Sequence, residues 1–359
     1  MLTISFCVIA RNEEKALPHL LEDLLGQTFP KNQTEVLLID SMSNDKTEAI
    51  MQAFAAAHGA EYHRVEVLPN PGRILAAGWN VALEHFTGDA ILRVDAHASI
   101  PAEFIEKNAA CLMGGEKVCG GRRPCVPQEK TPWQKTLLLA ENSLFGSSIA
   151  PYRRSQEHVY VQSLFHGCYR REVFETVGGY NEELVRTEDN EMNYRIRAAG
   201  YRLCYDPNIL SWQYVRSSLR GMIRQKYGNG KWIALTAGVC PACLSLYHFV
   251  PGAFLFGIVL PTILSLCGWP LLGWLMWGLY ALLCVVMTLC CVKDEHFTPV
   301  AFCMPVLFLL LHVTYGVGTW VGFCQLPFWK KKHHGGQSRR TEEIRCLLKE
   351  RSTQKEGTT

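Results

Sequence analysis

The sequence predicts an α/β domain built on a parallel sheet, followed by a membrane domain. In about the first hundred residues, continuous apolar strands alternate with amphipathic helices, which is typical of a parallel sheet covered by helices on both faces. Farther along, residues 232–292 and 297–329 contain no Asp, Glu, Lys or Arg. Such stretches are typical of membrane-spanning segments.

Length and composition limit the class of protein. With 359 residues, 48% hydrophobic side chains and a formal net charge of +3, the chain is long enough for one soluble domain and further segments. The apolar run 1–10 has no basic flank and leads directly into Arg-Asn-Glu-Glu, unlike a cleaved signal peptide. We therefore expect the soluble domain to lie in the cytosol. The 15 cysteines are scattered or lie in apolar runs, and we expect them to be small apolar residues in a reducing compartment.

The predicted strands and helices alternate regularly from the N-terminus. Each apolar strand is followed by a polar turn and a helix with apolar residues at helical spacing. Strands are predicted at 3–10, 35–40, 62–67 and 90–94, and helices at 17–25, 46–58 and 74–85.

Acidic residues end two of these strands. Asp40 ends one, and Asp95 follows another, with His97 two residues later. In an extended segment such a pair points to the same side, so Asp95 and His97 can reach one divalent ion. Because ligands of open α/β sheets gather at the carboxyl ends of strands, a nucleotide site is indicated there. Taken alone, the D-x-H pattern is better explained by a strand followed by an Asx turn, because three-residue patterns are common.

Four motifs, in this order and spacing, resemble the nucleotide-sugar half of family 2 glycosyltransferases with the GT-A fold. They are CVIARNEE at 7–14, LIDSMSND at 38–45, PGRILAAGWN at 71–80 and RVDAH at 93–97. The resemblance continues through 166–183 and 187–200, and covers residues 3 to about 210. It implies a Rossmann-like, mixed but mostly parallel sheet in a catalytic domain spanning 1–215. Within the family, V-D-A-H-A followed by hydrophobic segments is most similar to the succinoglycan glucosyltransferase (ExoA) type.

The resemblance implies a nucleotide-sugar donor and a divalent cation. Asp95, with His97 replacing the family's second carboxylate, is expected to hold Mn²⁺ or Mg²⁺ against the diphosphate, and a nitrogen ligand favours Mn²⁺. Asp40 is expected to accept a hydrogen bond from the base, which suits UDP-sugars. The other donor-site residues carried over from the family are Ala10, Arg11, Glu13, Arg73 and Asn80.

The Glu188-Asp189 pair is predicted at the N-terminus of a helix, 190–199. Through the resemblance, Asp189 is the general base for the acceptor hydroxyl, which implies a single displacement with inversion. Without the resemblance, such a pair is explained by helix capping. Glu188, Gly167 and Gly179 are expected on the acceptor side.

Between the two halves, residues 117–154 are expected to form an irregular acceptor loop whose basic end, 151–154, meets either a lipid diphosphate or solvent. Residues 216–232 are predicted to be an interfacial helix with basic side chains facing lipid phosphates. The membrane domain, 233–329, is expected to contain three hydrophobic segments. We predict these at 246–267, 270–292 and 299–324, and a charged, mobile cytosolic tail at 330–359 with one short helix at 341–351.

The orientation of the membrane domain is left open by the sequence. Basic residues before and after it both favour the cytosol, which requires an even number of crossings. Either one hydrophobic segment is re-entrant, or residues 233–246 contribute a fourth. We expect a multi-pass protein of the cell membrane with a cytoplasmic catalytic domain.

Together these features predict a membrane-anchored inverting glycosyltransferase. It would move a hexose such as glucose from a UDP-sugar to a lipid-linked saccharide in bacterial polysaccharide synthesis, beside other assembly enzymes and with no nucleic-acid partner. An alternative is transfer to polyprenyl phosphate, whose oxygen needs no general base. An oxidoreductase is disfavoured because the first turn lacks G-x-G-x-x-G. A transporter is disfavoured because it needs charged residues in its apolar segments, and these segments carry only His248 and His312.

Overall fold

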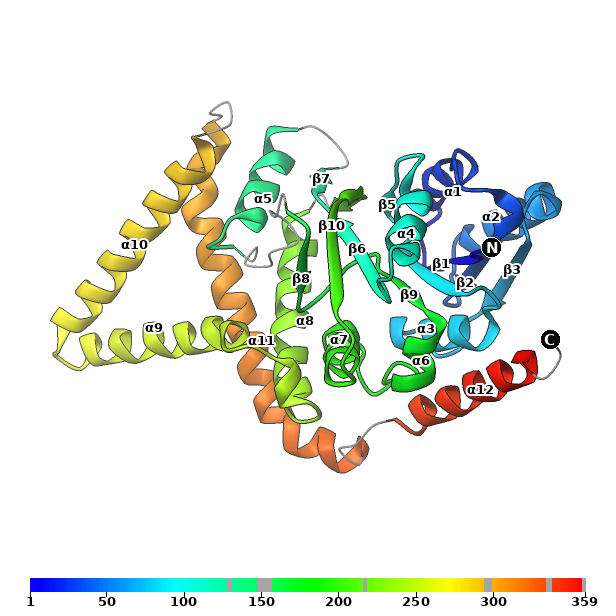
Figure 1. Ribbon diagram of the computed structural model, residues 1–359. Coiled ribbons are helices and arrows are strands. Elements are labelled where there is room, and N and C mark those ends of the chain that lie inside the picture. Colours follow the sequence, from blue (N-terminus) through cyan, green and yellow to red (C-terminus); the bar gives the residue numbers. More distant parts are fainter. Residues whose placement is uncertain (128–130, 147–156, 216–217, 294–298, 334–337, 357–359) are drawn as a thin grey trace. The chain divides into compact units, whose positions relative to one another are not determined.

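The computed structural model describes residues 1–127, 131–146, 157–215, 218–293, 299–333 and 338–356 (Figure 1). The chain divides into two compact units. The sheet unit comprises Met1–Pro124, Pro151–Tyr214 and Gln337–Thr359, and the helical unit comprises Cys125–Ala150 and Val215–Gly336. The basic segment 151–154 lies outside the described residues.

An eight-stranded sheet forms the centre of the sheet unit, with strand order β3-β2-β1-β4-β9-β6-β10-β8. Strands β3, β2, β1 and β4 are parallel, β9 runs antiparallel between β4 and β6, β10 is parallel to β6, and β8 is antiparallel at the edge. The predicted mixed, mostly parallel sheet is therefore confirmed. The bounds are β1 Ile4–Ala10, β2 Thr34–Asp40, β3 Arg64–Pro69, β4 Ala90–Asp95, β6 Val118–Arg122, β8 Val159–Val161, β9 Cys168–Arg170 and β10 Leu203–Leu210, and a short pair is formed by β5 Ala98–Ser99 and β11 Trp212–Val215.

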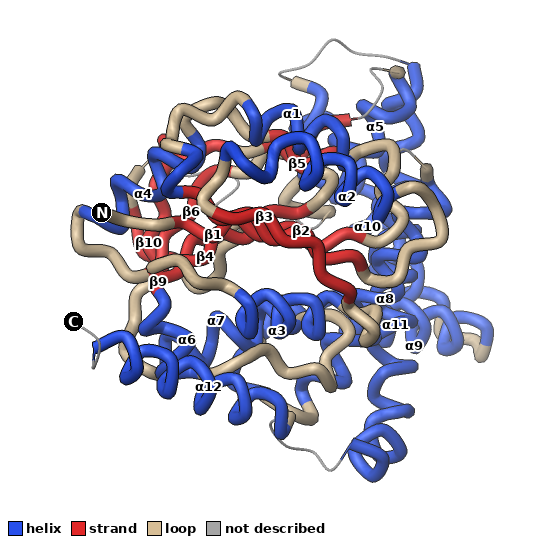
Figure 2. The backbone as a smooth tube through the Cα atoms, turned by 90° about the vertical axis from the view of Figure 1, so that its right-hand side faces the viewer, coloured by secondary structure: helices blue, strands red, loops and turns tan. Residues whose placement is uncertain are grey.

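Helices cover both faces of this sheet, as the alternating pattern predicts. Figure 2 shows α1, α2 and α4 on one face and α3, α6, α7 and α12 on the other. The main core lies under the first group, where alternate residues of β1 (Ile4, Phe6 and Val8) are fully buried against leucines of α1. The bounds are α1 Leu17–Leu25, α2 Thr47–His58, α3 Leu75–His85, α4 Phe104–Met113, α6 Arg171–Val177, α7 Glu188–Ala198 and α12 Arg339–Glu356.

The stretch predicted to be an irregular loop contains regular structure. Strand β6 pairs with β10 across a register shift, and β7 Cys125–Pro127 and α5 Pro132–Asn142 follow in the helical unit. The glycines that suggested a loop have a packing role, because a Cβ atom on Gly121 would collide with the backbone oxygen of Ile209. Helix α5 is capped by Thr131, which accepts a hydrogen bond from the backbone of Gln134 at 3.3 Å.

The C-terminal helix α12 is longer than the predicted 341–351 and packs against α3 and α6. Ile344 and Leu348 are fully buried there. The backbone nitrogen of Gly179 donates to the carbonyl of Thr341 at 3.0 Å. The described part of the predicted tail, 338–356, is therefore an integral helix of the sheet unit instead of a mobile extension.

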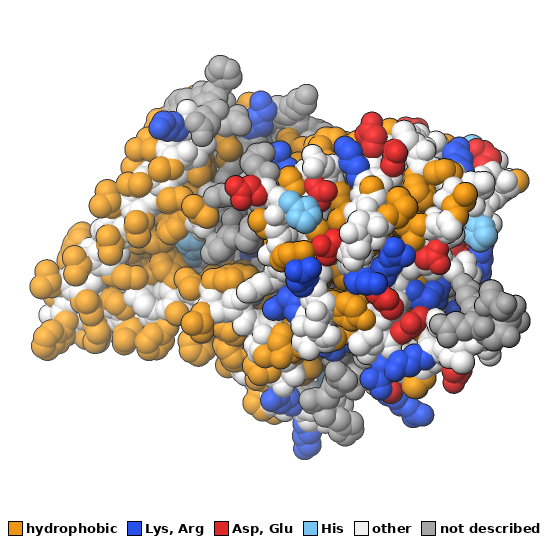
Figure 3. Space-filling model, viewed as in Figure 1, with side chains coloured by type: hydrophobic (Ala, Val, Ile, Leu, Met, Phe, Trp, Pro, Cys, Tyr) orange, Lys and Arg blue, Asp and Glu red, His pale blue; other side chains and the backbone are white. Residues whose placement is uncertain are grey.

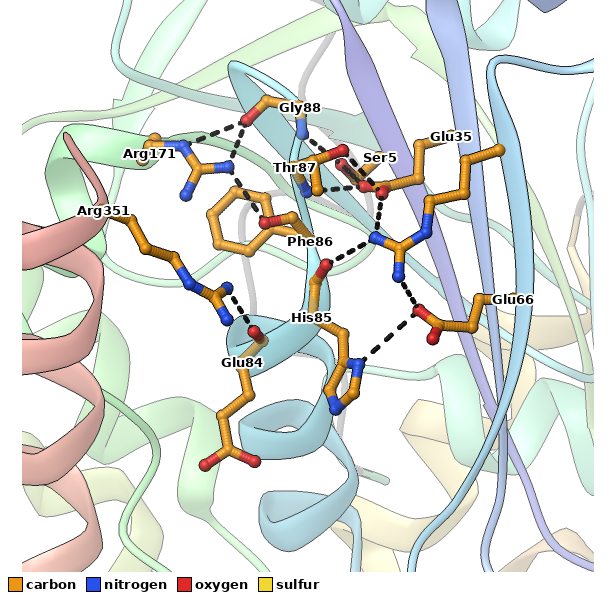
Figure 4. Close-up of polar contacts among 11 residues, drawn as sticks. Ser5, Glu35, Glu66, Glu84, His85, Phe86, Thr87, Gly88, Arg171 and Arg351 are labelled. Carbon is orange, nitrogen blue, oxygen red and sulfur yellow. Dashed lines mark hydrogen bonds and ion pairs between the residues drawn. The ribbon is translucent and has the colours of Figure 1, made fainter. Parts of the chain in front are cut away.

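Polar contacts tie α12 to the end of α3, and α6 to the turn that follows α3 (Figure 4). Arg351 of α12 donates to the carbonyl of Glu84, and Arg171 of α6 donates to the carbonyl of Gly88 at 2.7 Å. The fully buried carboxylate of Glu35 accepts hydrogen bonds from Thr87 in the turn after α3. These bonds satisfy backbone groups that would otherwise be buried without partners.

The helical unit contains the apolar helices. Three of them are long and apolar enough to cross a membrane, Leu246–Leu266, Pro270–Val292 and Pro299–His333, which confirms the predicted segments. The large side chains of α9 and α10 are mostly exposed, and Figure 3 shows hydrophobic side chains covering the surface of these two helices. The bounds are α8 Leu219–Ala237, α9 Val250–Leu266, α10 Pro270–Val292 and α11 Met304–His333.

Helix α8 corresponds to the predicted interfacial helix, but one of its basic residues has a different role. Lys226 is 4% exposed, and its ammonium lies 3.1 Å from the carboxylate of Glu141 in α5. Lys226 therefore does not face lipid phosphates. Close packing explains its burial, because α8 lies against α11, where Gly318 and Gly322 approach the backbone of α8. Residues 233–237 belong to α8, so no separate fourth apolar helix is present among the described residues.

Candidate active site

Loops at the carboxyl edge of the sheet carry an unusual backbone conformation. Among the described residues, five non-glycine residues have positive φ, namely Asn12, Met42, Arg73, His166 and Thr187. The first three follow β1, β2 and β3, His166 precedes the antiparallel β9, and Thr187 precedes α7. Backbone strain of this kind collects at functional sites, and here it marks the edge where the sequence predicts a nucleotide site.

Asp95 lies at the end of β4 and contacts a histidine that the sequence interpretation did not assign. Its carboxylate oxygen is 3.4 Å from Nε2 of His166, whose Nδ1 lies 2.8 Å from the hydroxyl of Ser211. Burial raises the pKa of Asp95, but His166 and Arg93 outweigh it and hold the pKa well below its usual range. Burial also lowers the pKa of His166. The structure thus pairs an ionised carboxylate with a neutral imidazole.

His97 is engaged through both ring nitrogens. Nδ1 lies 3.5 Å from the carboxylate of Glu13, and Nε2 lies 3.0 Å from the side-chain nitrogen of Gln213. The amide oxygen of Gln213 accepts from Arg123, which orients its NH₂ group towards His97. Nε2 of His97 therefore accepts a hydrogen bond, and Nδ1–H points to Glu13. A cation at His97 Nε2 would have to displace Gln213.

Arg93 supplies the central positive charge. It is 6% exposed, its guanidinium lies 4.8 Å from the centre of the Trp79 ring, and a terminal nitrogen is 3.8 Å from the carboxylate of Glu188. Burial lowers the pKa of Arg93, but at the high pH where a guanidinium titrates, the ionised Tyr180, Asp95 and Glu188 outweigh it and raise the pKa. Arg93 therefore stays charged between the acidic groups of β4 and α7.

The acidic pair lies in the first turn of α7, as predicted, although the helix begins at Glu188 itself. Burial raises the pKa of Glu188 to about 8, and the neighbouring Asp189 adds to the increase. Asp189 is partly exposed, and its carboxylate accepts a hydrogen bond from the backbone of Asn190 at 2.9 Å. The more accessible carboxylate of the pair is therefore Asp189.

The donor-site residues expected from the first two loops lie together at the ends of β1 and β2. Asp40, 4% exposed, accepts from the backbone nitrogen of Ser43 at 3.1 Å. The carbonyl of Ala10 accepts from the backbone of Ser41, and Arg11 reaches the carbonyl of Arg73 at 3.4 Å. Part of the Asp40 carboxylate is thus used within its own turn.

Three other expected site residues have clear structural contacts. Asn80 donates to the carbonyl of Tyr180 at 2.9 Å and accepts from its backbone nitrogen at 2.6 Å. A Cβ atom on Gly179 would lie 2.6 Å from Ile344 of α12 and 2.7 Å from the amide oxygen of Asn80. The carbonyl of Gly167 accepts from the backbone of Arg93 at 2.9 Å. These residues position the loops of the site, and the roles of Asn80 in donor binding and of both glycines in acceptor binding stay predictions.

Sequence reasoning missed Arg93 and His166 as members of this cluster. Both lie inside motifs that carry the family resemblance, and this position in the motifs is the feature of the sequence that could have identified them as site residues. Arg93 lies within a buried strand, and His166 precedes a short one, where side-chain direction is not readable from spacing. Only the antiparallel pairing of β9 with β4 brings His166 beside Asp95.

The donor set at Asp95 fits a divalent cation. Nε2 of His166 is buried and has no hydrogen-bond partner among the described residues, although it lies beside an ionised carboxylate. A neutral imidazole whose Nε2 lies 3.4 Å from an ionised carboxylate makes with it a pair of ligands suited to Mn²⁺. The structure thus favours His166 as the imidazole beside Asp95, whereas His97 lies between Glu13 and Gln213.

Comparisons with known proteins agree with this fold. Residues 5–178 match the family model described as Glycosyl transferase family 2. The chain is 29% identical over 225 residues to succinoglycan biosynthesis protein ExoA of Rhizobium meliloti, a match that covers 61% of this chain and 66% of that protein. It is 24% identical over 325 residues to a dolichyl N-acetyl-alpha-D-glucosaminyl phosphate 3-beta-D-2,3-diacetamido-2,3-dideoxy-beta-D-glucuronosyltransferase of Methanococcus voltae, covering 87% of this chain and 95% of that one.

A solved structure shows the same fold. The mannosyltransferase PcManGT of Pyrobaculum calidifontis, in complex with GDP-Man and Mn²⁺, matches with a TM-score of 0.54 and 16% identity. The match covers 91% of this chain and 87% of that one, so the shared architecture extends beyond the sheet.

Proposed function

The chain belongs to the family 2 glycosyltransferases, with a GT-A sheet unit, and from this premise we propose that it transfers a sugar from a UDP-sugar to a lipid-linked saccharide with inversion. The observation that carries the proposal is the cluster at the carboxyl edge, where Asp95, His166 and Arg93 lie near the Glu188-Asp189 pair. A group-transfer enzyme needs positive charge for the departing diphosphate and a base for the acceptor, and this cluster offers candidates for both.

Asp95 and His166 are the residues proposed to hold Mn²⁺ or Mg²⁺, with His97 near them as the residue that the sequence suggests. When bound, the cation would neutralise charge on the leaving diphosphate as a Lewis acid. Arg93 contributes a fixed positive charge and keeps Asp95 ionised. Mn²⁺ in the PcManGT structure supports the choice of cation.

Asp189 is proposed to accept the proton of the acceptor hydroxyl. It is more exposed than Glu188, whose raised pKa leaves it largely protonated at neutral pH. A protonated and buried Glu188 cannot serve as the base, but it lowers the negative charge around Asp189. A base that acts on the acceptor while the diphosphate leaves implies a single displacement, hence inversion.

The proposed acceptor is held in the membrane. Three apolar helices of this chain have the length of membrane spans, and the Methanococcus relative is named for a dolichyl-linked sugar phosphate. A membrane anchor raises the effective concentration of an acceptor that is confined to the bilayer. The proposed topology has the sheet unit in the cytoplasm, where nucleotide sugars are available.

Release of UDP tests the proposal. Full-length enzyme in membranes is given UDP-glucose, Mn²⁺ and a lipid extract that contains saccharide-linked lipids. Asp189→Asn should lower lipid-dependent release by about 100-fold or more, since general-base catalysis contributes about 10²–10⁴-fold. Asp206→Asn is the matched control, because the Asp206 carboxylate bonds only within its own turn, to Asn208, among the contacts the structure describes.

Two results would count against the proposal. Full turnover by Asp189→Asn would make Asp189 a helix-capping residue and favour transfer to polyprenyl phosphate. Release that needs no lipid, or that persists in excess chelator, would exclude the lipid acceptor or the cation, respectively.

A further inference from the structure

A second cluster of metal-ligating side chains lies away from the candidate active site. Cys111, His158 and Cys204 bring one ligand atom each to within 4.8 Å of the others. Cys111 is in α4, Cys204 is near the start of β10, and His158 directly precedes β8. Because β10 runs in the same direction as β4, this cluster lies at the opposite, amino-terminal edge of the sheet from Asp95.

Two of the three distances between ligand atoms are close to those of tetrahedral coordination. The two sulfur atoms are 3.7 Å apart. Two thiolates bound at about 2.3 Å to a tetrahedral zinc ion lie about 3.8 Å apart. Nε2 of His158 is 3.1 Å from Sγ of Cys204, and a bound ion would place these atoms at about 3.5 Å, a shift of a few tenths of an ångström.

Burial favours a defined site over a chance contact. Cys204 is fully buried and Cys111 is partly buried, whereas His158 is exposed. Two sulfur ligands are thus fixed by the core between α4 and the sheet, and the third ligand closes over them from the surface. Three protein ligands leave a fourth tetrahedral position for water.

We propose that Cys111, His158 and Cys204 form a binding site for a soft divalent metal ion, with Zn²⁺ as the fitting ion. Binding replaces the two thiol protons and is therefore favoured at higher pH. The ion joins α4, β10 and the residue that leads into the edge strand β8. Since β8 is only three residues long, it gains a cross-link that its few ladder hydrogen bonds do not provide.

Two probes test this site in the full-length protein, kept in detergent with a reductant. Zinc retained after gel filtration is measured by mass spectrometry, and Co²⁺ is added to follow the thiolate-to-cobalt absorption band. We expect one zinc ion per chain and a strong band in the wild type. Cys111→Ser and Cys204→Ser should lose the band, and His158→Ala should weaken affinity by about 10-fold or more.

Matched variants separate this site from others. Cys346→Ser removes an exposed cysteine on α12 and should keep the zinc and the band. Asp95→Asn should keep both as well, because the ligands near Asp95 contain no thiolate. His158→Ala changes an exposed side chain and should stay folded, so its loss of affinity does not depend on intact folding of the cysteine variants.

Three outcomes would overturn the proposal. One is a folded wild type that retains no zinc and gives no thiolate band. Another is a band that survives in all three variants of the cluster. The third is a Cys111–Cys204 disulfide in protein prepared without reductant, together with no metal binding after reduction.

Discussion

Around Asp95, buried charged side chains stabilise one another. The guanidinium of Arg93 is surrounded by the acidic groups of Asp95 and Glu188 and by the Trp79 ring. Charges in such surroundings are stabilised only as a set, and removing one member leaves another uncompensated. The protonation of Glu188 is the part of this set that changes near neutral pH.

Glu188→Gln is expected to flatten the pH dependence of stability in metal-free protein. Burial raises the pKa of Glu188 from 4.5 to about 8. A carboxyl group with a raised pKa stabilises the fold fully below its unfolded pKa and loses this contribution as the pH rises through the folded pKa. Between about pH 5 and pH 8.5, the wild type should lose on the order of 4 kcal/mol more free energy of unfolding than the variant. Thermal unfolding at several pH values measures the difference, and identical profiles would contradict the raised pKa.

Two histidine variants distinguish the ligand favoured by structure from the one favoured by sequence. Asparagine is chosen because it tolerates the positive φ of 42° at His166. His166→Asn should raise the Mn²⁺ concentration for half-maximal UDP release by about 10–100-fold, the range seen when a metal site loses a supporting group. His97→Asn should raise it by less, because His97 is held by Glu13 and Gln213. A larger effect in His97→Asn would restore the D-x-H pair as the ligand set.

Among the elements, the strands and first three helices could be predicted because each carries its own periodicity. Strands β1, β2 and β4 and helices α1, α2 and α3 lie within two residues of their predicted bounds. Strand β6 and helix α5 were missed, since glycines and prolines there reflect close backbone packing and a helix start. From the local sequence alone, glycine and proline predict turns. Their role in close packing depends on the neighbouring strand, which the local sequence does not specify.

The Gly178-Gly179 turn, which follows α6, packs against α12. Gly178 has φ of 78°, and a Cβ atom on Gly179 would lie 2.6 Å from Ile344. Gly179→Ala should therefore lower the free energy of unfolding by about 1–3 kcal/mol, the usual result of overpacking. Chemical denaturation measures the loss. Gly59→Ala is the control, since nothing lies within 4 Å of an added Cβ there.

An Ile344→Ala change tests the cause of that loss. Combined with Gly179→Ala, it should recover part of the lost stability, because it removes one of the two contacted atoms. Purely additive losses in the double variant would show that contact with α12 is not the reason for the glycine.

In the whole molecule, the sheet unit is discontinuous along the chain. Its last helix, α12, follows the apolar helices in sequence and packs on α3 and α6. Folding of the sheet unit is thus complete only after the helical unit has been synthesised. This connection could not be predicted from sequence, because α12 is highly charged and its buried side chains, Ile344 and Leu348, are few.

Deleting residues 339–359 should destabilise the sheet unit. The truncated protein loses the burial of Ile344 and Leu348, worth roughly 3–6 kcal/mol for two fully buried side chains. It also loses the ion pair between Arg340 and Glu84. A chain that ends after Thr353 keeps these contacts and is the control. Proteolysis and thermal unfolding in detergent measure the effect, and equal stability of the two forms would make α12 dispensable.

The sequence by itself determined the fold class, the family and the three apolar segments, because strands, helices, motifs and hydrophobic runs are encoded locally along the chain. The motifs also predict a place in the site for Asp95 and the Glu188-Asp189 pair. Only the tertiary structure decided which side chains meet. The antiparallel β9 brings His166 to Asp95, close helix packing buries Lys226 against Glu141, and the fold gathers Cys111, His158 and Cys204. These contacts join residues far apart in sequence, and no local pattern specifies them.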